Sequence, residues 1–193
     1  MPSVEKFKES LLIFDIDQKT IDRIYNGYET LKSSSPKNEK AAFFCRAQKI
    51  LDEKADRAQL IDLMDFNACC KNGIRDKASK DFAKQYSSLP LSEKIKLISG
   101  VPNMGNPELI ERNMIKTGIY WKDGDLYRCP CPNFNGLKEV PQMPLSYCLC
   151  CAGHFRYHYQ KMLGIKLLTH KIVSSPLNSL GKSPCEFIFR IDE

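Results

Sequence analysis

Cysteine is the residue of this chain with the most chemical potential. Nine cysteines occur among 193 residues, and five of them lie between positions 129 and 151, in the segments CPCP and YCLCC. A sixth, Cys185, follows in GKSPCEFIF. Thiols gathered in this way can form disulfides, bind a metal ion, act as nucleophiles or fill space as small apolar groups.

The start of the chain argues against a disulfide framework. Its apolar run, LLIF before Asp15, is shorter than a signal peptide or a membrane span requires. We therefore expect a cytoplasmic protein without a membrane partner, in which the thiols stay reduced. The odd number of cysteines favours the same interpretation.

The charge pattern does not favour a nucleic-acid partner. The chain has 29 Lys and Arg against 23 Asp and Glu, a net charge of +6, but the two signs are interleaved along it. A surface that binds phosphates along a nucleic acid needs clustered cations. The chain also has no GxGxxG loop, no P-loop and no GxSxG elbow. A homodimer is compatible with this sequence.

The elements that must position the thiols change character near residue 115. Before it, apolar residues recur at helical spacing and predict helices at 20–31, 33–54, 57–66, 74–90, 91–100 and 106–114. After it, residues 116–131 predict a hairpin turning at Asp123-Gly124, and 165–174 and 185–191 predict two further strands that pair with it. Between these pairs, residues 147–163 predict a helix that Gly164 ends.

This order predicts an α+β fold. A helical N-terminal part, residues 1–114, precedes a part at 115–193 in which a helix packs on an antiparallel sheet in the order strand, strand, helix, strand, strand. We expect the two parts to form one continuous globular domain.

The helix after residue 147 divides its side chains between two faces. One face is expected to pack on the sheet, and the other carries Cys150, His154 and His158, with the imidazoles expected at the surface. A helix N-terminus favours a thiolate over a thiol. Large rings between helix and sheet predict an apolar pocket that opens near Cys151. The residues expected to line it are Phe155, Tyr159 and Met162 from the helix and Trp121 and Phe187 from the sheet.

The cysteine motifs resemble a known group of proteins. CPCPNF, SYCLCCAGHF and GKSPCEFIF are similar to the Cys-x-Cys-Pro, Tyr-Cys-x-Cys-x-x-Gly and Gly-x-x-x-Cys-x-Phe elements of an uncharacterised cysteine-rich bacterial and archaeal family, over roughly residues 60 to 193. The last third also resembles, more distantly, the 4-vinyl reductase (V4R) small-molecule-binding domain. These resemblances imply a cytosolic metal- and small-molecule-binding protein of sensor or accessory type.

The V4R resemblance also implies a zinc site. Its phenol-sensing members hold zinc with an acidic residue and three cysteines, which carry over here to Cys151 and Cys185, while the middle cysteine falls on Leu177, which cannot bind a metal. Thiolates suit four-coordinate zinc. The candidate ligands are thus Cys129 or Cys131 in place of the acidic residue, with Cys148, Cys151 and Cys185. An iron–sulfur cluster is the less favoured cofactor, because the spacing matches no ferredoxin-like run.

A cysteine-dependent enzyme, either a hydrolase or a thiol redox protein, is the alternative. In it Cys150 would be the nucleophile and His154 the base. A similar end pattern in the 2-amino-thiazoline carboxylate hydrolase family supports this alternative. Cys69 and Cys70 are expected to be core or half-buried thiols, with a reach toward the cluster left open.

Overall fold

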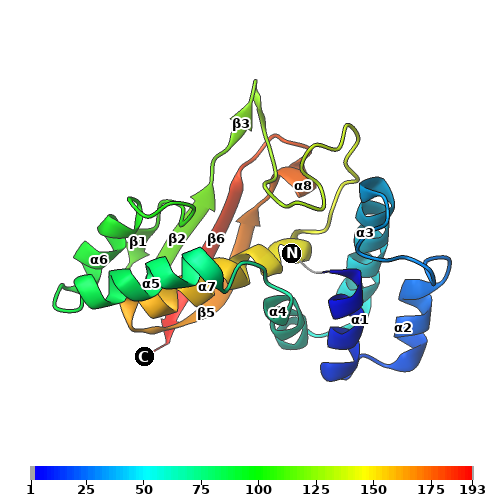
Figure 1. Cartoon of the computed structure of the whole chain (residues 1–193), viewed down its shortest axis with the longest axis horizontal. Coiled ribbons are helices and arrows are strands. Elements are labelled where there is room, and N and C mark those ends of the chain that lie inside the picture. The colour runs from blue at the N-terminus through cyan, green and yellow to red at the C-terminus, as the bar shows by residue number, and fades with distance from the viewer. Residues whose placement is uncertain (1–2, 193) are drawn as a thin grey trace.

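The computed structural model describes residues 3–192 (Figure 1). Six helices come first: α1 (Val4–Ile13), α2 (Gln18–Tyr25), α3 (Lys37–Lys54), α4 (Arg57–Phe66), α5 (Gly73–Gln85) and α6 (Leu91–Ile98). The strands β1 (Glu108–Glu111), β2 (Met114–Ile119), β3 (Lys122–Asp123) and β4 (Leu126–Tyr127) follow. The chain then forms the 3-10 helix η1 (Leu145–Cys148), α7 (Leu149–Leu163), β5 (Lys166–Ser174), α8 (Pro176–Ser179) and β6 (Cys185–Asp192).

The expected α+β class is confirmed. Four antiparallel strands form a sheet in the order β1-β2-β6-β5, and α7 lies along one face of it (Figure 1). Alternate residues of β6, Phe187 and Phe189, are fully buried against α7, as a strand covered on one face requires. Gly164, with φ of 70°, ends α7 in the left-handed conformation that glycine adopts without strain.

The hairpin differs from its expected form. Its turn is at Gly124, with Asp123 opposite Leu126, so the predicted turn position is right. However, β3 and β4 form a separate two-stranded sheet, and it is β2 that pairs with β6, with Thr117 opposite Phe187. The segment that carries Cys129 therefore leaves the sheet instead of extending it.

The helix expected over 106–114 is wrong, because Glu108–Glu111 is the edge strand β1. All four of its residues are exposed, so the strand has no buried face that periodicity could reveal. Its position depends on backbone pairing with β2, where Leu109 lies opposite Ile115. Helix α1, in turn, was not expected, although Phe7 and Leu11 stand at helical spacing and are buried.

Helix α7 belongs to two hydrophobic cores. The first core lies among α1 to α4 and the segment after β4, and it takes Leu149 and Cys150 from α7. The second lies between the sheet and α5, α6 and α7, and it takes Phe155 and Tyr159. The first turn of α7 therefore lies at the seam between the two cores, and this is where the thiols gather.

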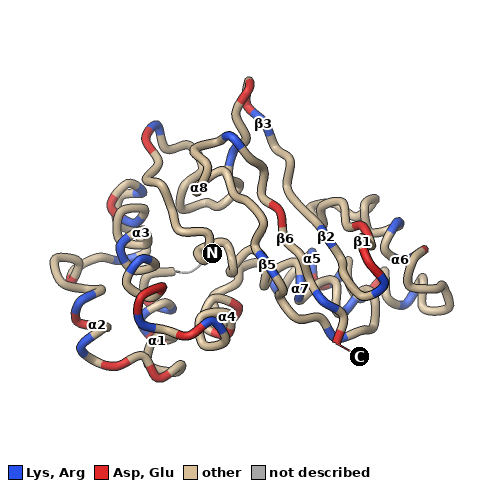
Figure 2. The backbone as a smooth tube through the Cα atoms, turned by 180° about the vertical axis from the view of Figure 1, so that it is seen from behind, with Lys and Arg blue, Asp and Glu red and all other residues tan. Residues whose placement is uncertain are grey.

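Basic and acidic positions are interspersed along the backbone of the helical part (Figure 2). Among residues 3–192, no helix combines the length and the apolar character that crossing a membrane requires.

Candidate functional site

Both faces of α7 are buried, so the expectation of surface imidazoles is wrong. His154 and His158 are 6% and 0% exposed, because α4 and α5 pack on their side of the helix. Gly153 permits this packing, since a Cβ there would lie 3.1 Å from Asp65 Cα and 3.2 Å from Ala68 Cβ. Close packing of α4 on α7 thus depends on a residue without a side chain.

The two histidines fix the segment that carries Cys69 and Cys70. His154 Nδ1 lies 3.2 Å from the carbonyl oxygen of Cys69, and His158 Nε2 lies 2.8 Å from that of Cys70. A carbonyl oxygen only accepts, so each of these ring nitrogens carries the hydrogen. Cys70 is held with φ of 62°, a conformation that a non-glycine residue adopts at an energetic cost. The imidazoles therefore bring two further thiols to the start of α7.

A pocket with a volume of about 360 Å³ lies at this point, and five cysteines line it. They come from three separate parts of the chain: the segment after α4, the segment after β4 and the first turn of α7. These residues are Cys69, Cys70, Cys131, Cys150 and Cys151. A hollow therefore lies beside Cys151, and Cys69 and Cys70 join the motif cysteines in its wall.

The remaining wall of the pocket is largely apolar. Phe155 contributes from α7 and Ile119 from the end of β2, and Arg75 of α5 is a lining cation with no ion pair among residues 3–192. Gly105, with φ of 66°, lets the loop after α6 approach this wall, because a Cβ there would lie 2.7 Å from the carbonyl oxygen of Gly118. Sequence reasoning missed both Arg75 and this loop. For the loop, the Asn-Pro pair after Gly105 was the available signal.

Within the pocket, Cys150 is the thiol whose pKa is lowered. A hydrogen bond from Cys151 lowers the pKa of Cys150, and the cation of Lys71 acts in the same direction against the effect of burial. The same hydrogen bond, together with burial, raises the pKa of Cys151. Burial raises the pKa of Cys69. A cysteine with a lowered pKa beside cysteines with raised pKa values is the arrangement expected of a reactive or soft-metal-binding thiol.

A second group of thiols continues from the pocket into the core. A hydrogen bond from Cys131 lowers the pKa of Cys129, but a hydrogen bond with Cys185 and burial outweigh it and raise that pKa to about 12. The pKa of Cys131 is raised, first by its hydrogen bond with Cys129 and then by burial. Burial raises the pKa of Cys148, whose Sγ lies 3.2 Å from Ser175 Oγ. These thiols are therefore held in the neutral form.

The five expected zinc ligands are divided between two places. Cys131 and Cys151 line the pocket, Cys185 lies beside Cys129, and Cys148 turns to Ser175. Thiolates are donors that zinc accepts, but among residues 3–192 no three His, Cys, Asp or Glu side chains stand where they could hold one metal ion. All nine cysteines are free thiols. As arranged, the residues do not fit a zinc ion.

Of the residues expected to contact an apolar ligand, Phe155 lines the pocket. Tyr159, Met162 and Phe187 are buried in the second core, outside the pocket wall. There the hydroxyl of Tyr159 forms a hydrogen bond with Thr117, with 2.7 Å between the Tyr159 hydroxyl oxygen and Thr117 Oγ1. Trp121 is 46% exposed and does not line the pocket; it lies beyond the last residue of β2, where the chain leaves the sheet.

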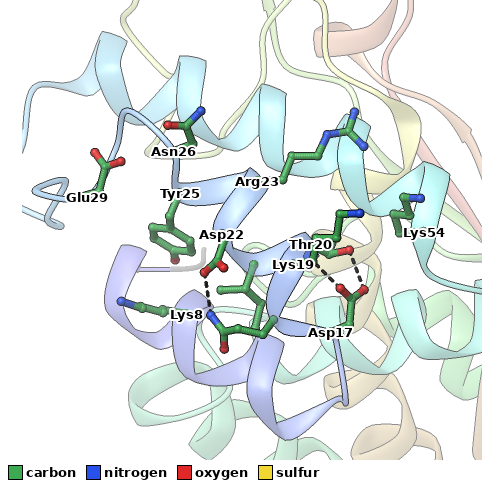
Figure 3. A pocket seen from close by; sticks show the side chains of 12 residues that line it. Lys8, Asp17, Lys19, Thr20, Asp22, Arg23, Tyr25, Asn26, Glu29 and Lys54 are labelled. Atoms are coloured by element: carbon green, nitrogen blue, oxygen red, sulfur yellow. Dashed lines mark hydrogen bonds between the residues drawn. The ribbon is translucent and has the colours of Figure 1, made fainter.

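A larger hollow, of about 960 Å³, lies along α2 and is drawn in Figure 3. Its lining alternates in charge, with Lys19 and Arg23 near Asp17 and Asp22, and includes no cysteine and no histidine. Asp17 already accepts from Thr20, whose backbone nitrogen is 2.9 Å away. This hollow therefore concentrates neither one charge nor a reactive group.

The thiol-lined pocket is thus the part of the described chain in which reactive side chains converge. Its chemistry follows from five sulfurs, the imidazole of His154, the cation of Arg75 and an apolar wall. In the comparisons with known proteins, no family model, no curated protein and no solved structure matches the chain.

Proposed function

We propose that this protein binds a small apolar or aromatic molecule in the thiol-lined pocket, as a sensor or accessory protein. The observation that carries the proposal is the pocket itself, in which Cys150 and four other cysteines stand beside an apolar wall. Its volume of about 360 Å³ lies near the lower end of the range of ligand sites and suits a molecule with one or two rings.

The thiols give this pocket its chemical preference. A soft sulfur next to Phe155 and Ile119 favours a polarisable, weakly hydrated ligand over a strongly hydrated one. Because its lowered pKa makes Cys150 a better nucleophile than its neighbours, a ligand with an electrophilic atom can also be held through that atom. Arg75 provides the charge that a polar end of the ligand would meet.

The state of His154 argues for binding and against a Cys150–His154 hydrolase. Burial, with smaller effects from His158 and Arg75, lowers the pKa of His154 to about 3. Its Nδ1 hydrogen is also engaged by the carbonyl oxygen of Cys69. An imidazole with this pKa is a weak proton acceptor at neutral pH. We therefore assign His154 to positioning Cys69.

The proposal is tested with 2-naphthol, a fluorescent two-ring probe. We expect saturable binding to the intact protein and loss of binding in Ile119→Trp, which fills the pocket. The matched control is Ile110→Trp on β1, which makes the same change at a site 42% exposed and outside the pocket. Equal binding by both variants would refute the proposed site.

Thiol redox activity is the second candidate, and the hydrogen-bonded pairs of sulfurs favour it. Cys151 bonds Cys150, and Cys129 bonds Cys131. With hydrogen peroxide as oxidant, the Cys150 thiolate would attack one peroxide oxygen, forming a sulfenic acid and hydroxide. A neighbouring thiol would then displace water to form a disulfide. Mass spectrometry should find Cys150 in a disulfide that dithiothreitol reverses, and oxidation of Cys150 without a disulfide would exclude this candidate.

Zinc stays a prediction of the motif resemblance. It would require the thiols to leave their present hydrogen bonds and converge, because no suitable group of three exists among the described residues. Metal content of protein purified without a metal column decides the matter. About one zinc per chain, as in four-coordinate structural sites, would support it.

A further inference from the structure

A third hollow, with a volume of about 650 Å³, lies where α4, α7, β5 and β6 meet. Four cations line it against a single carboxylate, that of Asp62; these cations are Arg57, Arg156, Lys171 and Arg190. Figure 2 shows basic positions on β5. This concentration of one charge contrasts with the interleaved charges of the hollow along α2.

Most of this positive charge is not neutralised by the protein. Arg156 pairs with Asp65, with 2.8 Å between its NH2 and Oδ2. Arg57, Lys171 and Arg190 form no ion pair among residues 3–192. Three of the four lining cations are thus unpaired within the described chain, and Asp62 is the one acid that lines the hollow with them.

A bulge in β5 helps to position two of the cations. The register with β6 shifts between Thr169 and Lys171, so that His170 is an extra residue in the ladder. The guanidinium of Arg57 donates to the carbonyl oxygen of His170. This bond ties the first turn of α4 to the edge strand and orients Arg57 beside Lys171.

The other wall of the hollow is apolar. Ile61 of α4 and Leu168 of β5, both half-buried, line it. A ligand that fits both walls carries an anionic group at one end and an apolar or planar body at the other. The volume exceeds what a single phosphate group fills, so the hollow has room for such a body.

We propose that this hollow binds a small molecule that carries a phosphate or diphosphate group. Arginine presents paired donors that match phosphate oxygens, and lysine adds a point charge. The proposal concerns a site other than the thiol-lined pocket and does not depend on its function, because the two share no lining residue.

The test is isothermal titration of the full chain with inorganic pyrophosphate and with ADP at a fixed salt concentration near 0.15 M, where nonspecific surface attraction is screened. The variant is Lys171→Gln with Arg190→Gln, two exposed residues whose replacement leaves the cores intact. The matched control is Lys166→Gln with Arg112→Gln, which removes the same charges outside the hollow.

We expect saturable binding to the unmodified protein and to the control, and a loss of about 100-fold or more in affinity in the hollow variant, since each charge-assisted bond contributes about tenfold or more. Tighter binding of ADP than of pyrophosphate would show that the apolar wall takes the ligand body. Equal loss in both double variants, or no saturable binding of either ligand, would overturn the proposal.

Discussion

The hydrogen bond from Cys151 to Cys150 leads to a prediction about reactivity. Replacing Cys151 by alanine removes the first cause of the lowered pKa of Cys150 and leaves the cation of Lys71 and the opposing effect of burial. We therefore expect the pKa of Cys150 to rise and its thiolate fraction at neutral pH to fall.

The size of the effect follows from the energy of one charge-assisted hydrogen bond. Such a bond is worth about 1.5–3 kcal/mol, and a factor of ten in an equilibrium corresponds to about 1.4 kcal/mol. At a pH below the pKa, where the rate is proportional to the thiolate fraction, alkylation of Cys150 should slow by roughly 10- to 100-fold.

The assay is the rate of alkylation by iodoacetamide between pH 5 and pH 9, followed by mass spectrometry of the peptide that contains Cys150. The pocket gives this small reagent a route to Cys150, which is 1% exposed. Each other cysteine reports on its own peptide, so a general change in structure would be visible in the same experiment.

The control is Cys151→Ser, because a hydroxyl can donate the hydrogen bond that alanine cannot. We expect serine to restore most of the rate that alanine removes. Unchanged alkylation of Cys150 in Cys151→Ala, or equal slowing in both variants, would refute the assignment of Cys151 as the donor that stabilises the thiolate.

Three other predictions concern stability, each measured as the free energy of unfolding in urea. Gly153→Ala should lose about 1 kcal/mol, because its Cβ meets Asp65 Cα at 3.1 Å and overpacking outweighs the helix propensity gained; a more stable variant would contradict this. His154 has a pKa of about 3 in the folded protein, below its usual 6.5, so the unfolded chain takes up a proton there first as the pH falls. The free energy of unfolding should therefore be highest above pH 6.5 and fall by about 1.4 kcal/mol per pH unit toward pH 3. His154→Gln should flatten this slope between pH 6.5 and pH 4.5. Thr117→Val should lose about 1 kcal/mol with the hydrogen bond to Tyr159, and no loss would mean that this bond has no net effect.

Much of the fold follows from periodicity in the sequence. Helix α4 begins and ends where its apolar pattern predicts, at Arg57 and Phe66, because its buried residues Leu60, Leu63 and Met64 recur at helical spacing. The alternation around Phe187 likewise marks a strand covered on one face. In both elements a local pattern coincides with a buried face, and this is the condition under which such predictions succeed.

The thiol-lined pocket was harder to predict from the sequence, because it depends on which segments from elsewhere in the chain pack against α7. A helical wheel separates Cys150 and His154 from the sheet, but it cannot show that α4 and α5 cover them. The approach of Cys69 and Cys70 is a tertiary effect of two hydrogen bonds between residues more than 80 positions apart. Arg75 gave no signal, since a single arginine on an amphipathic helix is usually a solvated one.

The shared position of α7 has a consequence for how the molecule comes apart. Because this helix supplies Cys150 to one core and Phe155 to the other, neither core can be lost without exposing part of the other. We therefore expect a single cooperative unfolding transition, seen at the same urea concentration by tryptophan fluorescence from Trp121 and by helical circular dichroism. For the same reason a shortened chain starting at residue 115 would lose the edge strand β1 and leave the His158 side of α7 open to water, and we expect such a fragment to aggregate.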